Sequence, residues 1–147
     1  MTIRRATVGD LAALEPMMIA FNASEGIAFD PVVARTAVDR LLSSDEVGLI
    51  LIGEAAGAAI GYAVVTWGFD LEFAGRDAFL TELYVEPEHR RHHVGGALLE
   101  AALTSARAAG AAALHLLVDP TNPPAIALYR RADFEPSHRV MMTKRLR

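Results

Sequence analysis

Cysteine is missing from this sequence of 147 residues. The chain therefore cannot form a disulfide, a thiolate metal site or a covalent acyl-cysteine intermediate. Long apolar runs are missing too: none approaches the roughly 20 residues that span a bilayer, and the opening MTIRRATVGD lacks the apolar segment of a signal peptide. We expect a cytoplasmic protein whose chemistry uses no thiol nucleophile.

The sequence also lacks an excess of positive charge, because 14 Lys and Arg stand against 18 Asp and Glu. A net acidic chain is a poor general binder of nucleic acid or of anionic membranes, although a local basic site is compatible with it. Internal repeats and flexible linkers are absent, and the length suits one compact domain. The sequence therefore predicts a single domain over residues 1–147 with no nucleic-acid or membrane partner.

Two helices are predicted after a short first strand. Thr7 and Asp10 form a capping pair before the first helix, and Asp30 followed by Pro31 begins the second. Helical spacing assigns core-facing positions to Leu11, Leu14, Met18 and Phe21 in the first helix, and to Val33, Ala37 and Leu41 in the second.

Strands dominate the middle of the chain. Residues 47–69 predict an antiparallel hairpin, 78–85 a third strand, and 94–110 a helix of small residues. The apolar stretch at 111–118 is typical of a strand buried on both faces, residues 123–134 of a short helix, and 138–146 of a last strand. The order β-α-α-β-β-β-α-β-α-β predicts an α/β or α+β sandwich with helices on both faces of its sheet.

The stretch ELYVEPEHRRHHVGGALLEAAL, residues 82–103, predicts an anion site. A helix start presents unpaired N–H groups, Gly95 and Gly96 admit a ligand close to the backbone, and Arg90 and Arg91 add positive charge. A pyrophosphate suits these groups, and tight strand-to-helix packing is the alternative. Since Pro87 ends the strand, residues 83–86 need not pair fully with the strand at 111–118, and a peptide-like ligand could pair there instead.

Two segments resemble signatures of the GNAT acetyltransferases. ELYVEPEHRRHHVGGALL resembles the strand and turn that hold acetyl-CoA, and NPPAIALYRRADF resembles the second signature of the family. The resemblance implies a mixed, mostly antiparallel sheet with one splayed parallel strand pair, and an N-acetyltransferase that uses acetyl-CoA as co-substrate. The sequence departs from the family at His93 and Asp133, where glycine is customary. A positive φ costs histidine more than glycine, whereas aspartate tolerates it better than most residues.

The resemblance also implies the site residues. The acetyl-CoA-binding residues would be Leu83, Tyr84, Val85, Arg90, Arg91, His92, His93, Val94, Gly95, Gly96, Asn122 and Tyr129. Tyr129 would be the acid for the departing thiolate, with a core aromatic as the alternative. Glu82 is the candidate base, with an ordinary salt bridge as the alternative. His89, His92 and His93 lack metal-ligand spacing, so we expect no metal, and we expect His115 to be a hydrogen-bonded core histidine.

The acceptor is left open by the sequence. We expect a primary amine of a small molecule, and a weaker similarity to the diamine and polyamine acetyltransferases agrees with an acidic group at Asp70, Glu72 and Asp77. Peptide, protein or aminoglycoside amines are alternatives, as is a non-catalytic acyl-CoA-sensing module. Exposed strands and apolar hairpin residues make a homodimer plausible.

Overall fold

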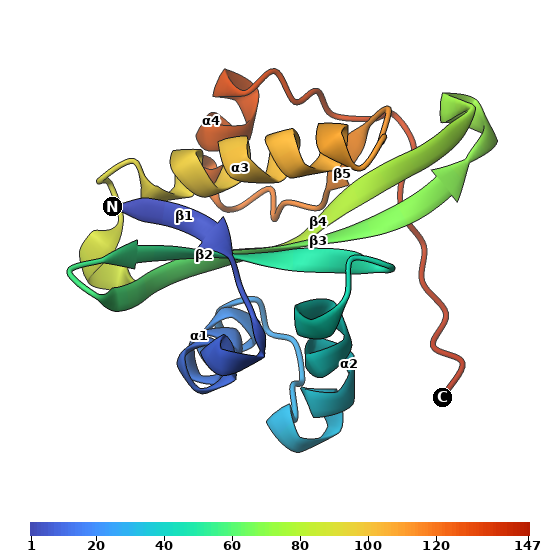
Figure 1. The fold of residues 1–147 in the computed structure, drawn as a ribbon. Helices are drawn as coiled ribbons and strands as arrows, with labels where there is room; N and C mark the ends of the chain where they lie inside the picture. Colours follow the sequence, from blue (N-terminus) through green and yellow to red (C-terminus); the bar gives the residue numbers. More distant parts are fainter. The chain divides into compact units, whose positions relative to one another are not determined.

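The computed structural model describes all residues from 1 to 147, and these form two compact units (Figure 1). The first, Met1–Leu117, holds the elements β1 (Thr2–Arg5), α1 (Leu11–Ser24), α2 (Pro31–Ser43), β2 (Gly48–Ala55), β3 (Ala58–Asp70), β4 (Gly75–Val85), α3 (Val94–Ala108) and β5 (Leu114–Leu116). Short 3₁₀ helices lie at Val8–Asp10, Leu71–Phe73 and Pro87–His89. The second unit, Val118–Arg147, holds α4 (Pro123–Arg131).

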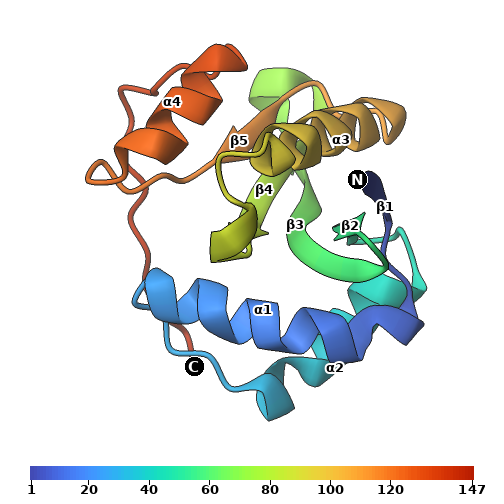
Figure 2. The same cartoon turned by 90° about the vertical axis from the view of Figure 1, so that its left-hand side faces the viewer.

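A five-stranded sheet in the order β1-β2-β3-β4-β5 forms the centre of the first unit. All neighbours are antiparallel except β4 and β5, which are parallel because α3 connects them. Helices α1 and α2 lie on one face of the sheet and α3 lies on the other (Figures 1 and 2). The predicted fold class, with a mostly antiparallel sheet between helices, is confirmed.

The predicted helix starts are confirmed by their caps. Asp30 accepts a hydrogen bond from the Val32 N–H at 2.9 Å, and Pro31 occupies the first turn, where its missing N–H costs nothing. Thr7 and Asp10 form a capping box around the 3₁₀ turn that leads into α1. No helix in the chain has the length and apolarity needed to cross a membrane.

The predicted core face of α1 is confirmed, whereas in α2 only Leu41 of the three predicted residues packs against the core. Leu14 and Met18 are buried in the core between α1, α2 and the sheet. In α2, however, Val33 is 77% exposed, and the buried residues are Val38 and Leu42. Positions 33, 37, 41 and positions 34, 38, 42 are both apolar rows at helical spacing, so only packing against the sheet decides between them.

Two strand predictions near the C-terminus need correction. β5 covers only Leu114–Leu116, and its residues are partly exposed because it lies at the edge of the sheet rather than between two strands. No strand forms at 138–146, where Val140 and Met142 are 86% and 92% exposed. A mixed apolar and basic stretch is stable as a strand only with a partner, and the second unit contains none.

Candidate functional site

Strand β4 diverges from β5 at a β-bulge. The parallel pairing ends at Leu80↔Leu116, and the β3–β4 register then shifts so that Thr81 is an extra residue on β4. A bulge bends its strand and increases the local twist. The β5-facing edge of Leu83, Tyr84 and Val85 is therefore not covered by a strand, which confirms the predicted splay.

The turn before α3 presents a row of unpaired amides. No backbone acceptor pairs with the N–H groups of residues 91–96, and the first helical bond runs from Ala97 N–H to the His93 carbonyl at 3.1 Å. Arg91 and His93 have φ of 65° and 64°, in the left-handed region. Left-handed residues near a helix start turn successive amides toward one point, which is the geometry of an anion site. We call residues 91–96 the amide cradle.

The basic side chains of this turn have different surroundings. Arg90 donates from Nε to the Val85 carbonyl at 2.9 Å, and its guanidinium lies 5.6 Å from the centre of the Tyr84 ring. Arg90 thus ties the turn to the end of β4. The side chains of Arg91, His92 and His93 are exposed. His93 stands where the signature usually has glycine, and it adopts the positive φ that glycine would favour there. This left-handed conformation costs about 1–2 kcal/mol in a residue with a Cβ.

Glu82 and Tyr62 form a half-buried acid–phenol pair on the α1 side of the sheet. The Tyr62 hydroxyl donates to Glu82 Oε2 at 2.5 Å, and the Tyr62 ring is fully buried. Burial raises the pKa of the Glu82 carboxyl, and the hydrogen bond from Tyr62 offsets part of that rise. Burial and the nearby carboxylate raise the pKa of Tyr62, which stays protonated. Glu82 makes no ion pair, so the alternative of an ordinary salt bridge is excluded.

The Tyr62→Phe variant is expected to move the acidic limb of the kcat/KM profile to higher pH. The lost hydroxyl stabilises the charged form of Glu82, so its removal raises the pKa of a carboxyl that must be deprotonated to act as a base. Phenylalanine keeps the ring contacts with Phe21 and Tyr84, so folding is preserved. A profile measured from acid to alkaline pH checks this, and an unmoved limb would contradict Glu82 as the titrating group.

The second unit positions two further predicted residues on α4. Asn122 caps the helix, its side chain accepting from the Ala125 N–H at 3.3 Å. Tyr129 packs edge-on against Phe134 with ring centres 5.9 Å apart. Asp133 adopts a φ of 64° where the helix ends, and the following N–H bonds back to the Tyr129 carbonyl at 3.0 Å. The predicted tolerance of aspartate for this conformation is thus met.

His115 differs from its prediction. It is hydrogen-bonded, as expected, by Asp77, with Nε2 3.0 Å from Oδ2, but its side chain is 32% exposed because β5 is an edge strand. The sequence also gave no sign of Tyr62 as the partner of Glu82, since only the strand register brings them together. No group of three possible metal ligands occurs in the chain.

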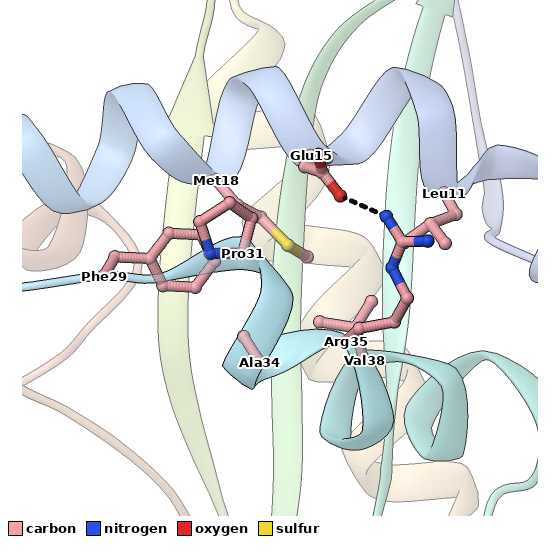
Figure 3. A pocket seen from close by; sticks show the side chains of 8 residues that line it. All are labelled: Leu11, Glu15, Met18, Phe29, Pro31, Ala34, Arg35 and Val38. Carbon is pink, nitrogen blue, oxygen red and sulfur yellow. Dashed lines mark hydrogen bonds and ion pairs between the residues drawn. The ribbon is translucent and has the colours of Figure 1, made fainter.

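A small hollow between α1 and α2 is too narrow for a substrate (Figure 3). Its volume is about 10 Å³, which is room for about one water molecule. Arg35 and Glu15, which both line the hollow, form an ion pair with a nitrogen–oxygen distance of 3.0 Å. Met18 and Phe29 contribute apolar surface to the lining. The hollow is a feature of helix packing, and within the first unit the candidate site consists of the splayed edge of β4, the amide cradle and Glu82.

Known proteins are similar to this chain in sequence and in fold. Residues 18–134 match the acetyltransferase (GNAT) family. The uncharacterized N-acetyltransferase YhfO of Bacillus subtilis (strain 168) is 32% identical over 135 residues, covering 92% of this chain and 90% of YhfO. An integron cassette protein from the Cole Harbour salt marsh metagenome has a TM-score of 0.87 at 28% identity, over 99% and 90% of the two chains. The aminoglycoside N-acetyltransferase AAC(6')-Iy, solved with CoA, has a TM-score of 0.85 at 19% identity, over 99% and 94%.

Proposed function

Because the chain belongs to the acetyltransferase (GNAT) family and is an acyltransferase, we propose that it transfers acetyl from acetyl-CoA directly to a primary amine of a small molecule. The observation that carries this proposal is the amide cradle beside the open edge of β4. Such a pair of features offers N–H groups to a pyrophosphate and an unpaired strand edge to an amide-containing chain. Acetyl-CoA contains both groups, and AAC(6')-Iy, which shares the fold, was solved with CoA.

In the proposed complex each part of acetyl-CoA has its own protein partner. The amide cradle, residues 91–96, binds the pyrophosphate, with Arg90 nearby. Backbone groups of Leu83, Tyr84 and Val85 pair with the pantetheine arm and polarise the thioester carbonyl. Asn122 helps to fix the CoA, and Tyr129 lies near its sulfur. The matched residues 18–134 extend over both units, which supports a single N-acetyltransferase domain.

The transfer needs a neutral nitrogen close to the thioester carbon. Glu82 accepts, directly or through water, the proton that the neutral amine loses as its nitrogen bonds to the acetyl carbon, and it releases this proton to solvent after the carbon–sulfur bond has broken. Tyr129 donates a proton to the departing thiolate and regains one from solvent. Holding both substrates in one complex can lower the activation barrier by on the order of 7–11 kcal/mol through proximity and orientation. Direct transfer also agrees with the absence of cysteine, because the chain has no thiol that could form an acyl-cysteine intermediate.

The proposed acceptor is a small amine. A small amine fits the half-buried position of Glu82 and the acidic composition of the chain. Aminoglycoside acceptors belong to AAC(6')-Iy by its name, and its 19% identity supports the shared fold alone. Peptide or protein amines are the other candidates. A cytoplasmic location and a homodimer stay predictions from the sequence.

An amine panel tests the proposal. Purified protein, acetyl-CoA and small monoamines, diamines, aminoglycosides and peptides are expected to give amine-dependent release of thiol and a product heavier by one acetyl group in the mass spectrum. Tyr129→Phe is expected to slow this release modestly, since the phenol assists the thiolate only when it is well positioned. CoA-dependent thermal stabilisation without any acetylated product, and without an effect of Tyr129→Phe, would instead indicate a non-catalytic CoA-binding module.

A further inference from the structure

Residues 140–147, which we call the terminal segment, expose several apolar side chains. Val140, Met142 and Leu146 are 86%, 92% and 90% exposed. The terminal segment forms neither helix nor strand (Figure 1), and it makes no backbone hydrogen bond and no ion pair. Folded domains seldom leave several neighbouring apolar side chains in water unless these side chains bind a partner. The terminal segment is therefore a candidate interaction surface.

The terminal segment has the residue pattern of a strand with one apolar face. Val140, Met142 and Leu146 occupy alternate positions, interrupted by Lys144, and the intervening positions hold a methionine, a threonine and two arginines. Successive residues of a strand point to opposite faces, so the three apolar side chains would share one face. Lysine fits the same face, because its long stem can lie on apolar surface while its charge reaches water. The pattern predicts a half-buried strand that needs a sheet edge to pair with.

Strand β5 offers such an edge. It pairs with β4 alone, so no strand pairs with its second edge. The apolar sequence continues past β5, and there Leu117 is 67% exposed and Val118 is 39% exposed. An open strand edge presents N–H and C=O groups that can pair with a strand of another molecule. The composition of residues 111–118 predicts a strand with two neighbours, and a strand added at this edge would supply the second neighbour.

The charges of the two parts are complementary. Lys144, Arg145 and Arg147 make the terminal segment positive, and it contains no acidic residue. Residues 1–117 are net negative, with eight Lys and Arg against fifteen Asp and Glu. An acidic unit attracts a basic segment. Of the two edge strands, β1 carries two arginines and β5 carries neither lysine nor arginine, so the β5 edge avoids placing like charges on paired strands.

We propose that the terminal segment of one copy pairs with the β5 edge of a second copy, and that two copies exchange these segments reciprocally. A second copy supplies both the open edge and the acidic unit that the segment matches. Pro136 supports exchange, because proline fixes its own φ and holds Glu135 extended, and a stiff connection after α4 favours pairing with another molecule over folding back. In a two-fold symmetric dimer each such contact occurs twice. This inference goes beyond the proposed function, since it needs neither acetyl-CoA nor an amine.

Sedimentation equilibrium over a range of protein concentrations, without acetyl-CoA, tests the proposal. The wild type is expected to be a dimer. Val140→Asp is expected to raise the dissociation constant of the dimer about 100-fold, because it places a charge in each of two symmetric contacts and each costs about tenfold. The side chain of Val140 is exposed in the single chain, so the variant should fold normally. Val33→Asp makes the same change at another valine, 77% exposed on α2, and is expected to leave the dissociation constant unchanged.

Leu117→Lys tests the receiving edge, because it adds positive charge beside β5 where the basic segment would pair. It is expected to weaken the dimer about tenfold or more. Leu71→Lys is the matched control, at a leucine that is 86% exposed in the 3₁₀ turn between β3 and β4.

Three results would overturn the proposal: a monomeric wild type, a dimer that survives Val140→Asp, or a dimer that survives Leu117→Lys. A dimer that is lost in Leu71→Lys and kept in Val140→Asp would place the interface at the tip of the β3–β4 hairpin instead. Loss of the dimer in Val140→Asp and Leu117→Lys, with both controls dimeric, would support the exchange of terminal segments. None of these results depends on whether the protein transfers acetyl groups.

Discussion

The Glu82→Gln variant is expected to lower kcat by about 10²–10⁴-fold, the usual contribution of a general base. Glutamine keeps the size of the side chain and can still meet the Tyr62 hydroxyl, but it cannot take a proton from the amine. Burial raises the pKa of Glu82, which makes the carboxylate a stronger base than an exposed glutamate. The wild type should therefore lose activity as the pH falls through that raised pKa, and the variant should lose this limb of the profile.

Steady-state kinetics with a reactive amine from the panel, measured from acid to alkaline pH, check both effects. Glu100→Gln is the matched control, because it makes the same chemical change on the exposed side of α3. CoA binding by Glu82→Gln should be unchanged, since the cradle amides lie in another segment. A variant that keeps the wild-type rate and the wild-type acidic limb would show that another group accepts the proton.

The Gly61→Ala variant is expected to destabilise the fold by about 3 kcal/mol, at the upper end of the usual cost of overpacking. A Cβ at Gly61 would lie 2.6 Å from the Tyr84 carbonyl oxygen and 3.3 Å from the Val85 Cα, both backbone atoms that cannot rotate away. The Leu98 Cδ1, at 3.2 Å, closes the third side. The clash also displaces the end of β4, so the variant should bind CoA more weakly than its stability alone explains.

Urea unfolding of Gly61→Ala beside the wild type measures the change in the free energy of unfolding. Gly9→Ala is the control, because a Cβ at Gly9 has only the Thr7 hydroxyl nearby, at an ordinary 3.7 Å. If Gly61→Ala binds CoA more weakly but unfolds at the same urea concentration as the wild type, the added Cβ displaces the edge of β4 without destabilising the fold. Unchanged stability together with unchanged CoA binding would contradict the close approach of β3 and β4 at this position.

Local patterns in the sequence sufficed for most elements of the fold. Asp30 and Pro31 mark the start of α2 because a cap and a proline act within one turn, and the amide cradle follows from a short segment around Gly95 and Gly96. The face of α2 could not be predicted, because Val33 and Ala34 begin two apolar rows of equal spacing. Apolar periodicity identifies a helix, but packing against the sheet determines which face of the helix is buried.

The unpredicted parts of the site depend on pairing between distant segments. Tyr62 and Glu82 meet only because β3 and β4 align in one register, and a shift of one residue would turn Glu82 to the other face. The exposure of His115 depends on the place of β5 in the sheet, which no pattern within that strand encodes. Residues 138–146 have the composition of a strand, but their unit contains no strand with which they could pair. The strand predicted from composition therefore does not form.

The extra residue at Thr81 has an evolutionary consequence. Loss of one codon here would leave every β3 partner in place, since Leu80 and Glu82 already face Val65 and Val64 in succession. The shortened strand would lose its bend, however, and could continue its ladder with β5 past Leu116. A single deletion of this kind would yield a protein with an intact sheet in which β5 covers the edge of β4 that is now open.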